Sequence, residues 1–282
     1  MLNSNGINKP HLVHNCPLCS SYNLYLMNRR QYQVGICREC YSLLSFTIQN
    51  NSNTYDYNYY QNNYVERNLN SASKFDHVIE RFCFSEYAKV LDYGAGVGDF
   101  ATTLINKNLT DVCVYDNSSA AYNFLSDRFI DEPSVNVLIQ LKDERFDAIC
   151  LFDVLAHVED AQDLLIELSL VNLLPDGKIF IRTPLVNKIT ALIIISIAKL
   201  TMGKLDGPLF HYKTRNFIAS RDGANKLFRS ANLHISDFYF DRDPIRMAAP
   251  LNYKNVVSTM IKKLLFVFNN KNSIVHKLKY RN

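Results

Sequence analysis

Lys89-Val90-Leu91-Asp92-Tyr93-Gly94-Ala95-Gly96-Val97-Gly98-Asp99 is the stretch of sequence that decides the fold. Val90 and Leu91 are apolar and predict the end of a buried strand, and three alternating glycines follow. The next run, 100–105, predicts the first turns of a helix. Glycine lets the backbone take positive φ and lets a ligand approach closely, and a helix N-terminus directs free N–H groups at that ligand. The stretch therefore predicts a nucleotide-type site.

The spacing of the glycines narrows the ligand. A dinucleotide fingerprint needs G-x-G-x-x-G, but here the third glycine comes one residue early and Asp99 stands where that motif has glycine. Asp92 lies directly before the turn, where a carboxylate would repel a pyrophosphate and attract a cationic amino group. The spacing therefore disfavours a nicotinamide dinucleotide.

A second acidic residue follows the next predicted strand. Residues 111–116 are a short apolar run that ends in Asp116, about 20 residues beyond the glycine turn, where a carboxylate can receive both ribose hydroxyls. The alternative is that Asp116 caps a helix over 118–128; the preceding glycines favour ribose binding. Gln140 and Leu141 follow a third predicted strand, where adenine contacts are expected.

Further strands are predicted at 146–152 and 178–182, with helices at 73–87 and 161–171. Strands that alternate with helices predict an α/β fold with a doubly wound, mostly parallel sheet. Ligands of such sheets bind outside the carboxyl ends of the strands. Asp153 falls at one of these ends, as do the glycine turn and Asp116.

Residues 73–184 resemble the class I S-adenosylmethionine-dependent methyltransferases. An acidic residue before G-x-G-x-G is similar to motif I of that family. The runs F-D-A-I-C-L-F-D-V-L-A-H-V (146–158) and L-L-P-D-G-K-I-F-I-R-T-P (173–184) are similar to its "FD…VLEHV" and "LLKPGG…I.TP" patterns. Ala156 departs from the pattern where many relatives carry Glu, and Asp176 departs where they carry Gly.

The resemblance implies a Rossmann-like sheet of the seven-stranded type and S-adenosylmethionine as cofactor. Together with the strand ends, it assigns these positions to cofactor binding: Asp92, Gly94, Ala95, Gly96, Gly98, Asp116, Asn117 and Asp153.

Two closely spaced C-x-x-C pairs predict a small N-terminal zinc ribbon, with ligands Cys16, Cys19, Cys37 and Cys40. Each pair can present two thiolates, and four cysteines leave no open position for catalysis, so the Zn²⁺ is expected to be structural. Disulfides are the competing interpretation and are disfavoured in a cytosolic chain. The scattered Cys83, Cys113 and Cys150 are predicted to be core residues.

The sequence divides into four predicted segments: a zinc ribbon at 1–46, a Tyr/Asn-rich linker at 47–72, the cofactor-binding domain at 73–245, and a basic amphipathic helical tail at 246–282. A helix over 187–200 is expected to cover the active-site mouth, and 233–240 to form an antiparallel strand at the sheet edge. The tail's apolar stripe, from 253 to 268, predicts packing on the domain; the alternative is peripheral contact of 251–282 with an anionic membrane.

Charge and hydropathy restrict partners and location. The net charge is +4, yet 251–282 contains seven Lys/Arg and no Asp/Glu, which leaves −3 for the rest. The main body is therefore not a basic nucleic-acid surface. The N-terminus has no apolar signal run, and the longest apolar run, 189–197, is too short to span a bilayer. We expect a cytoplasmic protein, peripheral to the inner membrane face if the tail binds lipid.

The ribbon, the Tyr-rich joint and the main domain together resemble a bacterial subgroup that includes sugar methyltransferases. The resemblance implies methyl transfer to a small-molecule acceptor, such as a nucleotide- or lipid-linked sugar of polysaccharide biosynthesis. The reaction needs alignment of two reactants and, for some acceptors, removal of a proton. His157 and His211 are the candidate bases. Alternatively, His157 caps the following helix and His211 binds substrate.

Two other functions stay open. One is an rRNA or tRNA methyltransferase that uses the ribbon to bind RNA, which the acidic main body disfavours. The other is a non-catalytic cofactor-binding module.

Overall fold

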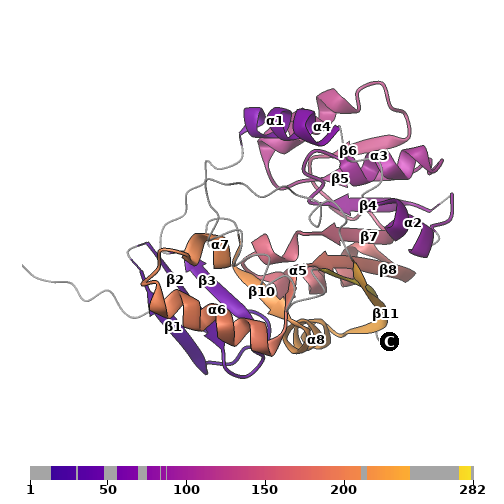
Figure 1. Cartoon of the computed structure of the whole chain (residues 1–282). Helices are drawn as coiled ribbons and strands as arrows, with labels where there is room; N and C mark the ends of the chain where they lie inside the picture. Colours follow the sequence, from indigo (N-terminus) through magenta and orange to yellow (C-terminus); the bar gives the residue numbers. More distant parts are fainter. Residues whose placement is uncertain are drawn as a thin grey trace, which may run out of the picture.

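The computed structural model describes residues 14–29, 31–47, 56–68, 75–82, 84–86, 88–210, 215–241 and 273–280. The main sheet has seven strands in the order β11-β12-β8-β7-β4-β5-β6 (Figure 1). Their bounds are β4 Val90–Tyr93, β5 Val112–Tyr115, β6 Val135–Leu138, β7 Phe146–Phe152, β8 Leu173–Thr183, β11 Leu233–Asp241 and β12 Ser273–Tyr280.

The five strands from β8 to β6 are parallel, and β12 is antiparallel to both of its neighbours. The predicted α/β class with a doubly wound, mostly parallel seven-stranded sheet is confirmed. β11 lies at the sheet edge as expected, but it runs in the same sense as β8, and the reversed strand is β12.

For residues 273–280 the predicted helical tail is wrong, because this segment forms β12 inside the sheet. Ile274 pairs with Thr183 of β8 and with Phe240 of β11. From Ile274 to Tyr280 every second residue is apolar or aromatic, apart from a histidine, a period of two that suits a strand. The amphipathic stripe at 253–268 lies outside the described residues.

Alternating side chains of the strands divide between two packed faces. One face is covered by α2 (Asp76–Phe82), α3 (Asp99–Asn106) and α4 (Ser119–Arg128), and the other by α5 (Ala161–Glu167) and α8 (Arg221–Ser230). Val90 and Leu91 are both fully buried, one in each cluster. Because both faces are covered, the ligand-binding ends of the strands remain as the accessible edge.

A second sheet joins the N-terminal ribbon to the main domain. Its order is β1 (Leu24–Asn28), β2 (Tyr32–Cys37), β3 (Leu43–Thr47), β10 (Phe217–Ser220) and β9 (Leu185–Val186). Three strands therefore come from the ribbon and two from the region after β8. The ribbon is not a separate appendage, because the main domain completes its sheet.

Helix α6 (Lys188–Leu200) forms where a helix was predicted, and its buried face packs on the ribbon sheet. The apolar contacts join Ala191, Ile194, Ile195 and Ala198 to Met27, Val34 and Ile36. The short α7 (Asp206–Phe210) joins the same cluster. No helix of the described part is long and apolar enough to cross a membrane.

The Tyr/Asn-rich stretch predicted as a linker contains helix α1 (Tyr57–Asn68), which lies beside α4 (Figure 1). The rings of Tyr57, Tyr60 and Tyr64 surround Phe124 of α4 at centroid distances of 6.1, 6.2 and 5.7 Å. These tyrosines therefore dock the stretch on the domain.

Candidate functional site

The glycine turn connects β4 to α3 and adopts left-handed backbone geometry. The φ angles of Gly94 and Gly96 are +73° and +58°. A Cβ at Gly94 would lie 2.6 Å from Val154 Cγ2, so this glycine permits close backbone packing. At Gly96 a Cβ would have no atom within 4 Å, so this position faces open space. The turn thus leaves room for a ligand directly in front of Gly96.

Asp116, at the end of β5, accepts two backbone hydrogen bonds. Its Oδ2 accepts from the Gly96 N–H at 3.1 Å and its Oδ1 from the Ser118 N–H at 3.0 Å. Burial raises the pKa of Asp116, and these two bonds act in the opposite direction. The N-cap of α4 is Ser118, whose Oγ accepts from the Ala121 N–H. Each Asp116 oxygen keeps acceptor capacity for a ribose hydroxyl.

Asp92 is buried beside the turn, with 3% of its surface exposed. Burial raises the pKa of Asp92 to about 7; a backbone hydrogen bond from Ala101 acts in the opposite direction, and the charges of Asp116 and Asp99 add to the rise. Among the described residues no group donates a hydrogen bond to its Oδ2. A buried carboxylate oxygen without a donor is costly, and a cationic amino group would satisfy it.

Arg128 of α4 contacts the glycine turn and the helix that follows it, and it was not among the predicted site residues. Its guanidinium donates hydrogen bonds to Val97 O and, at 2.8 Å, to Thr102 Oγ1. Its Cζ lies 4.4 Å from the centroid of the Tyr64 ring. An arginine in the last turn of a helix is a common C-terminal residue, so the sequence carried no signal for this role.

Asp153 follows β7 with a φ of +62°, which is uncommon for a residue with a side chain. Its backbone N–H donates to Arg182 O at 2.8 Å, and Arg182 Nη1 lies 3.4 Å from Asp153 Oδ2. Arg182, in β8, is only 2% exposed. Arg182 was not among the predicted site residues, although an arginine directly after the apolar run Ile179–Ile181 was a usable signal.

The predicted site residues fall at adjacent strand ends. Gly96 and Asp116 are in direct contact, and Asp92 lies close enough for its charge to couple with Asp116. The Gly94 and Ala95 N–H groups both donate to Tyr115 O and hold the turn against β5. Asn117 is exposed beside this group. Asp153 ends β7, the neighbour of β4.

A cleft of about 530 Å³ follows β6 and is lined by residues 137–145, which include Gln140 and Leu141. Its volume is within the usual range of small-ligand sites. Gln140 and Leu141, where adenine contacts were expected, thus line this cleft, whose lining includes neither the glycine turn nor Asp116.

His157 is exposed in the short 3₁₀ helix η1 (Leu155–His157), which follows β7. Its backbone N–H donates to Val154 O at 2.8 Å. The residue at the N-cap of α5 is Asp160, so His157 does not cap that helix. The other candidate base, His211, lies outside the described residues.

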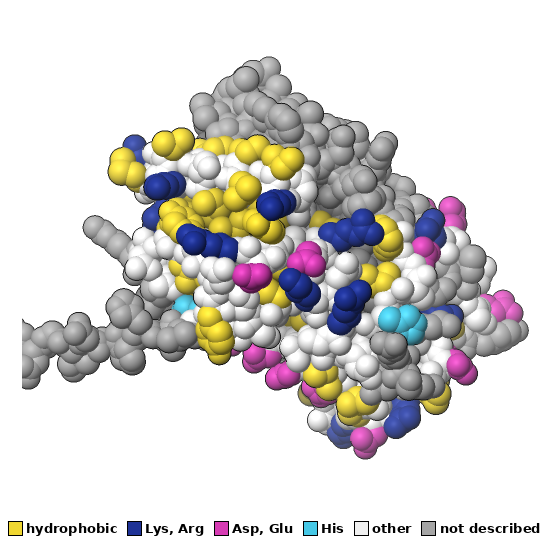
Figure 2. All heavy atoms as spheres, turned by 90° about the horizontal axis from the view of Figure 1, so that it is seen from below, with side chains coloured by type: hydrophobic (Ala, Val, Ile, Leu, Met, Phe, Trp, Pro, Cys, Tyr) yellow, Lys and Arg dark blue, Asp and Glu magenta, His cyan; other side chains and the backbone are white. Residues whose placement is uncertain are grey.

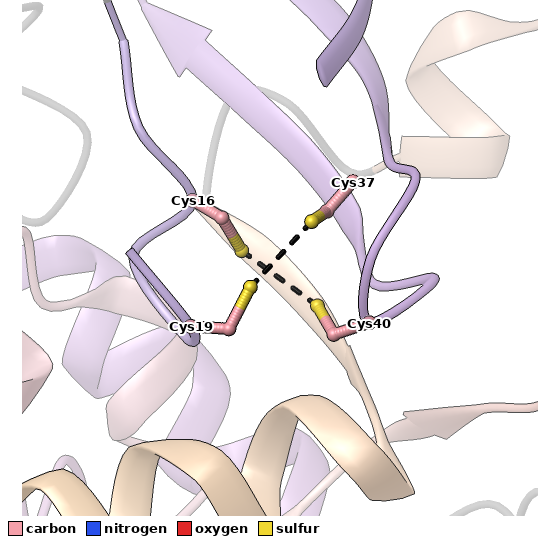
Figure 3. Close-up of side chains that lie close together, drawn as sticks. All are labelled: Cys16, Cys19, Cys37 and Cys40. Atoms are coloured by element: carbon pink, nitrogen blue, oxygen red, sulfur yellow. Dashed lines mark hydrogen bonds between the residues drawn. The ribbon is translucent and has the colours of Figure 1, made fainter. Parts of the chain in front are cut away.

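The four cysteines of the ribbon converge on one point (Figure 3). The Sγ atoms of Cys16 and Cys40 are 3.7 Å apart, and those of Cys19 and Cys37 are 3.6 Å apart. A disulfide would need about 2.05 Å. Zn–S bonds of about 2.3 Å in a tetrahedron place sulfurs about 3.8 Å apart, so the four thiols fit a zinc ion. Cys113 and Cys150 are buried core residues as predicted; Cys83 lies outside the described residues.

A family model described as a methyltransferase domain matches residues 57–236. No curated protein matches the sequence. Similar solved structures include a chain from the complex between the Haloferax volcanii Trm112 methyltransferase activator and a protein assigned as a methyltransferase. It shares 12% identity, with a TM-score of 0.56, over 79% of this chain and 95% of that one.

Two further structures have the same fold. A protein assigned as a methyltransferase from Bacillus halodurans is 12% identical, with a TM-score of 0.53, over 74% of this chain and all of that one. The [4+2]-cyclase SpnF is 13% identical, with a TM-score of 0.51, over 75% and 81%. At these identities the likeness concerns the fold. The family is shown by the model that spans most of the chain, and this protein belongs to the methyltransferase-domain family.

Proposed function

We propose that this protein transfers a methyl group from S-adenosylmethionine to a small-molecule acceptor. The observation that carries the proposal is the contact between Asp116 and the Gly96 N–H, with open space in front of that glycine. The ribose of the cofactor fits this arrangement, because the Asp116 carboxylate can accept hydrogen bonds from its hydroxyls. The match to the methyltransferase-domain family supports methyl transfer as the reaction.

Three groups of the chain would hold the cofactor. Asp116 would accept hydrogen bonds from the ribose hydroxyls, and the cleft after β6 would receive the adenine. Asp92 would pair with the ammonium group, which its partnerless buried oxygen favours, and the cation would lower the raised pKa of this carboxyl. Asp153, Asn117 and the rest of the turn would complete the pocket. The bound cofactor supplies an electrophilic methyl group, and the protein's main task is alignment.

The acceptor side would lie along η1. His157 is exposed there and would remove a proton from acceptors that must lose one. The Asn216 N–H donates to Ala156 O at 2.7 Å, and the Ser45 N–H donates to Asn216 O at 2.8 Å. This chain of bonds fixes the loop of His157 against the ribbon. His211 stays a second candidate from the sequence.

We further propose a nucleotide- or lipid-linked sugar as the acceptor class, on the resemblance of the ribbon and domain to sugar methyltransferases. One Zn²⁺ on the four cysteines would be structural, because all four coordination positions are taken by thiolates.

The decisive experiment combines binding and turnover. Calorimetry is expected to detect S-adenosylhomocysteine and not NAD. Methyl incorporation from labelled S-adenosylmethionine is then measured with pools of nucleotide sugars, lipid-linked sugars and ribosomal RNA. Transfer to a sugar pool supports the full proposal, and transfer to RNA would replace the acceptor class. Binding with no turnover in any pool would favour a module that only binds the cofactor, and no binding of S-adenosylhomocysteine would refute the proposal. The turnover assay is necessary because the [4+2]-cyclase SpnF has the same fold, so the fold alone does not establish methyl transfer.

A further inference from the structure

Helix α6 is apolar on two sides, and only one of them is covered. The side formed by Ala191, Ile194, Ile195 and Ala198 packs on the ribbon sheet. On the opposite side the exposed fractions of Ile189, Leu192 and Leu200 are 68, 45 and 80%, and that of Met202, in the following turn, is 82%. A helix that needed only its inner contacts would carry polar residues on its outer side.

Three of the exposed apolar residues, Ile189, Leu192 and Leu200, lie along one line of the helix and are called the stripe below. Positions 189, 192, 196 and 200 are separated by three or four residues and therefore lie along one line of the helix. Ser196 is the one polar member of that line. Figure 2 shows the corresponding face, with apolar side chains gathered beside Lys and Arg. Other exposed large apolar residues, such as Ile130 and Leu170, come from separate elements.

The stripe is accompanied by positive charge. Residues 187–205 contain three lysines and no acidic residue. Lys199 and Lys204 are exposed, and Lys188 Nζ lies 4.1 Å from the centroid of the Tyr41 ring. The next acidic residue, Asp206, is fully buried and paired with Arg29 Nε at 2.7 Å. That carboxylate therefore does not neutralise the surface.

We propose that the outer side of α6 binds an anionic lipid surface, with the stripe Ile189, Leu192 and Leu200 among the acyl chains and the lysines at the headgroups. The helix has 13 residues and a length of about 20 Å, so it lies in the interface rather than across it. Its inner side is fixed on the ribbon sheet, so the stripe is presented by a rigid support.

The lysines and the apolar stripe together favour anionic lipid over a second copy of the chain or a nucleic acid. A second copy that packed the same stripe on itself about a two-fold axis would bring like-charged lysines together. A nucleic acid would match the lysines but would leave the isoleucine and leucine side chains without an apolar partner. Anionic lipid matches both features. This inference is independent of the proposed methyl transfer.

The test uses the chain of residues 1–282, purified with Zn²⁺ in the buffer, and vesicles of phosphatidylcholine, with or without about one-third phosphatidylglycerol. Co-sedimentation is expected only with the anionic vesicles and is expected to weaken as salt is added. Ile189→Ser with Leu200→Ser should lower the vesicle partition coefficient by about tenfold or more. Lys199→Gln with Lys204→Gln should lower it and flatten the salt dependence.

A matched control is available in Ile130→Ser with Leu170→Ser, which removes one exposed isoleucine and one exposed leucine from other elements. This variant should bind vesicles like the wild type, and circular dichroism checks that all variants are folded. The proposal is refuted by a wild-type protein that stays in the supernatant at low salt. It is also refuted if the stripe variant binds like the wild type, as it would if 253–268 were the lipid-binding segment. A lipid-independent dimer that the stripe variant dissociates would assign the surface to a second copy.

Discussion

The hydroxyl oxygen of Ser42 accepts a hydrogen bond, 2.9 Å long, from the backbone N–H of Ser220. Ser42 follows the second cysteine pair, and Ser220 is the N-cap of α8. The Oγ of Ser220 accepts a hydrogen bond, 2.9 Å long, from the Gly223 N–H. The Ser220 hydroxyl also donates to Cys40 O. The cysteine loop is therefore the docking point for the first turn of α8, and α8 packs on the main sheet.

Gly223→Ala should destabilise the protein by about 1–3 kcal/mol, because a Cβ there would lie 2.3 Å from Ser42 Oγ and 3.2 Å from Cys40 Sγ. Urea unfolding followed by circular dichroism measures the change. Lys226→Ala, on the exposed side of the same helix, is the control and should cost less than about 1 kcal/mol. Equal stabilities of the two variants would show that α8 does not dock tightly on the loop.

Elemental analysis should find about one zinc per chain, bound by the four thiolates. A strong chelator should release it and lower the melting temperature, since the loop that supports α8 loses its organising ion. Cys113→Ser, at a buried cysteine outside the ribbon, should retain the full zinc content. A metal-free protein that melts at the same temperature as the zinc form would contradict a structural ion.

Asp116→Asn should weaken binding of S-adenosylhomocysteine by about 1–3 kcal/mol, the range for hydrogen bonds to a charged group. Titration calorimetry measures the dissociation constant. Asp131→Asn, an exposed acid in the turn after α4, should bind like the wild type. Unchanged affinity in Asp116→Asn would remove this carboxylate from the site.

Gly96→Ala should abolish cofactor binding, because the added methyl group would occupy the open space in front of the turn. It should also destabilise the fold by about 1–2 kcal/mol, because an alanine at this position would have to adopt a φ of +58°. Gly98→Ala should destabilise the fold more, since its Cβ would lie 2.8 Å from the Phe129 ring. Binding and thermal melting of the two variants separate these effects. Normal affinity in Gly96→Ala would mean that the ligand does not approach this glycine.

The raised pKa of Asp92, about 7, makes the stability of the ligand-free protein depend on pH. The folded state holds this proton more tightly than the unfolded state, whose pKa is about 3.9, so stability falls as pH rises from about 4 to 7. Asp92→Asn removes the titrating group and should be more stable than the wild type at pH 8 by about 1–4 kcal/mol. The advantage should shrink below pH 5.

The same carboxyl predicts proton release on cofactor binding near pH 6.5, because a cationic partner favours the ionised form. Calorimetry in buffers of different ionisation enthalpy would measure the release, and Asp92→Asn should abolish it. A wild-type protein that binds without releasing a proton would show that Asp92 does not meet the ammonium group.

Local sequence patterns predicted those features whose residues lie close together in the sequence or at a characteristic spacing. The glycine turn, Asp116 and the cysteine pairs depend on short spacings, and the structure brings each group together. Arg128 was missed because its partners, Val97 and Thr102, lie far away in sequence. The segment that forms β12 was predicted as part of a helical tail, although its own residues alternate with a period of two. The pairing of β10 with β3, at Phe217 and Leu44, could not be predicted either, because nothing local indicates that the main domain completes the ribbon sheet.

The place of β12 in the sheet has a consequence for folding during synthesis. β11 pairs only with β12 among the described strands, and β12 lies about 30 residues later in the sequence. At about 5–20 residues per second, β12 would be synthesised a few seconds after β11. During that time β8 and β11 would each have an unpaired edge, because the strand that lies between them is missing. Open strand edges recruit other chains, so a protein factor that shields nascent chains should matter more for this protein than for one whose edge strands pair in order of synthesis.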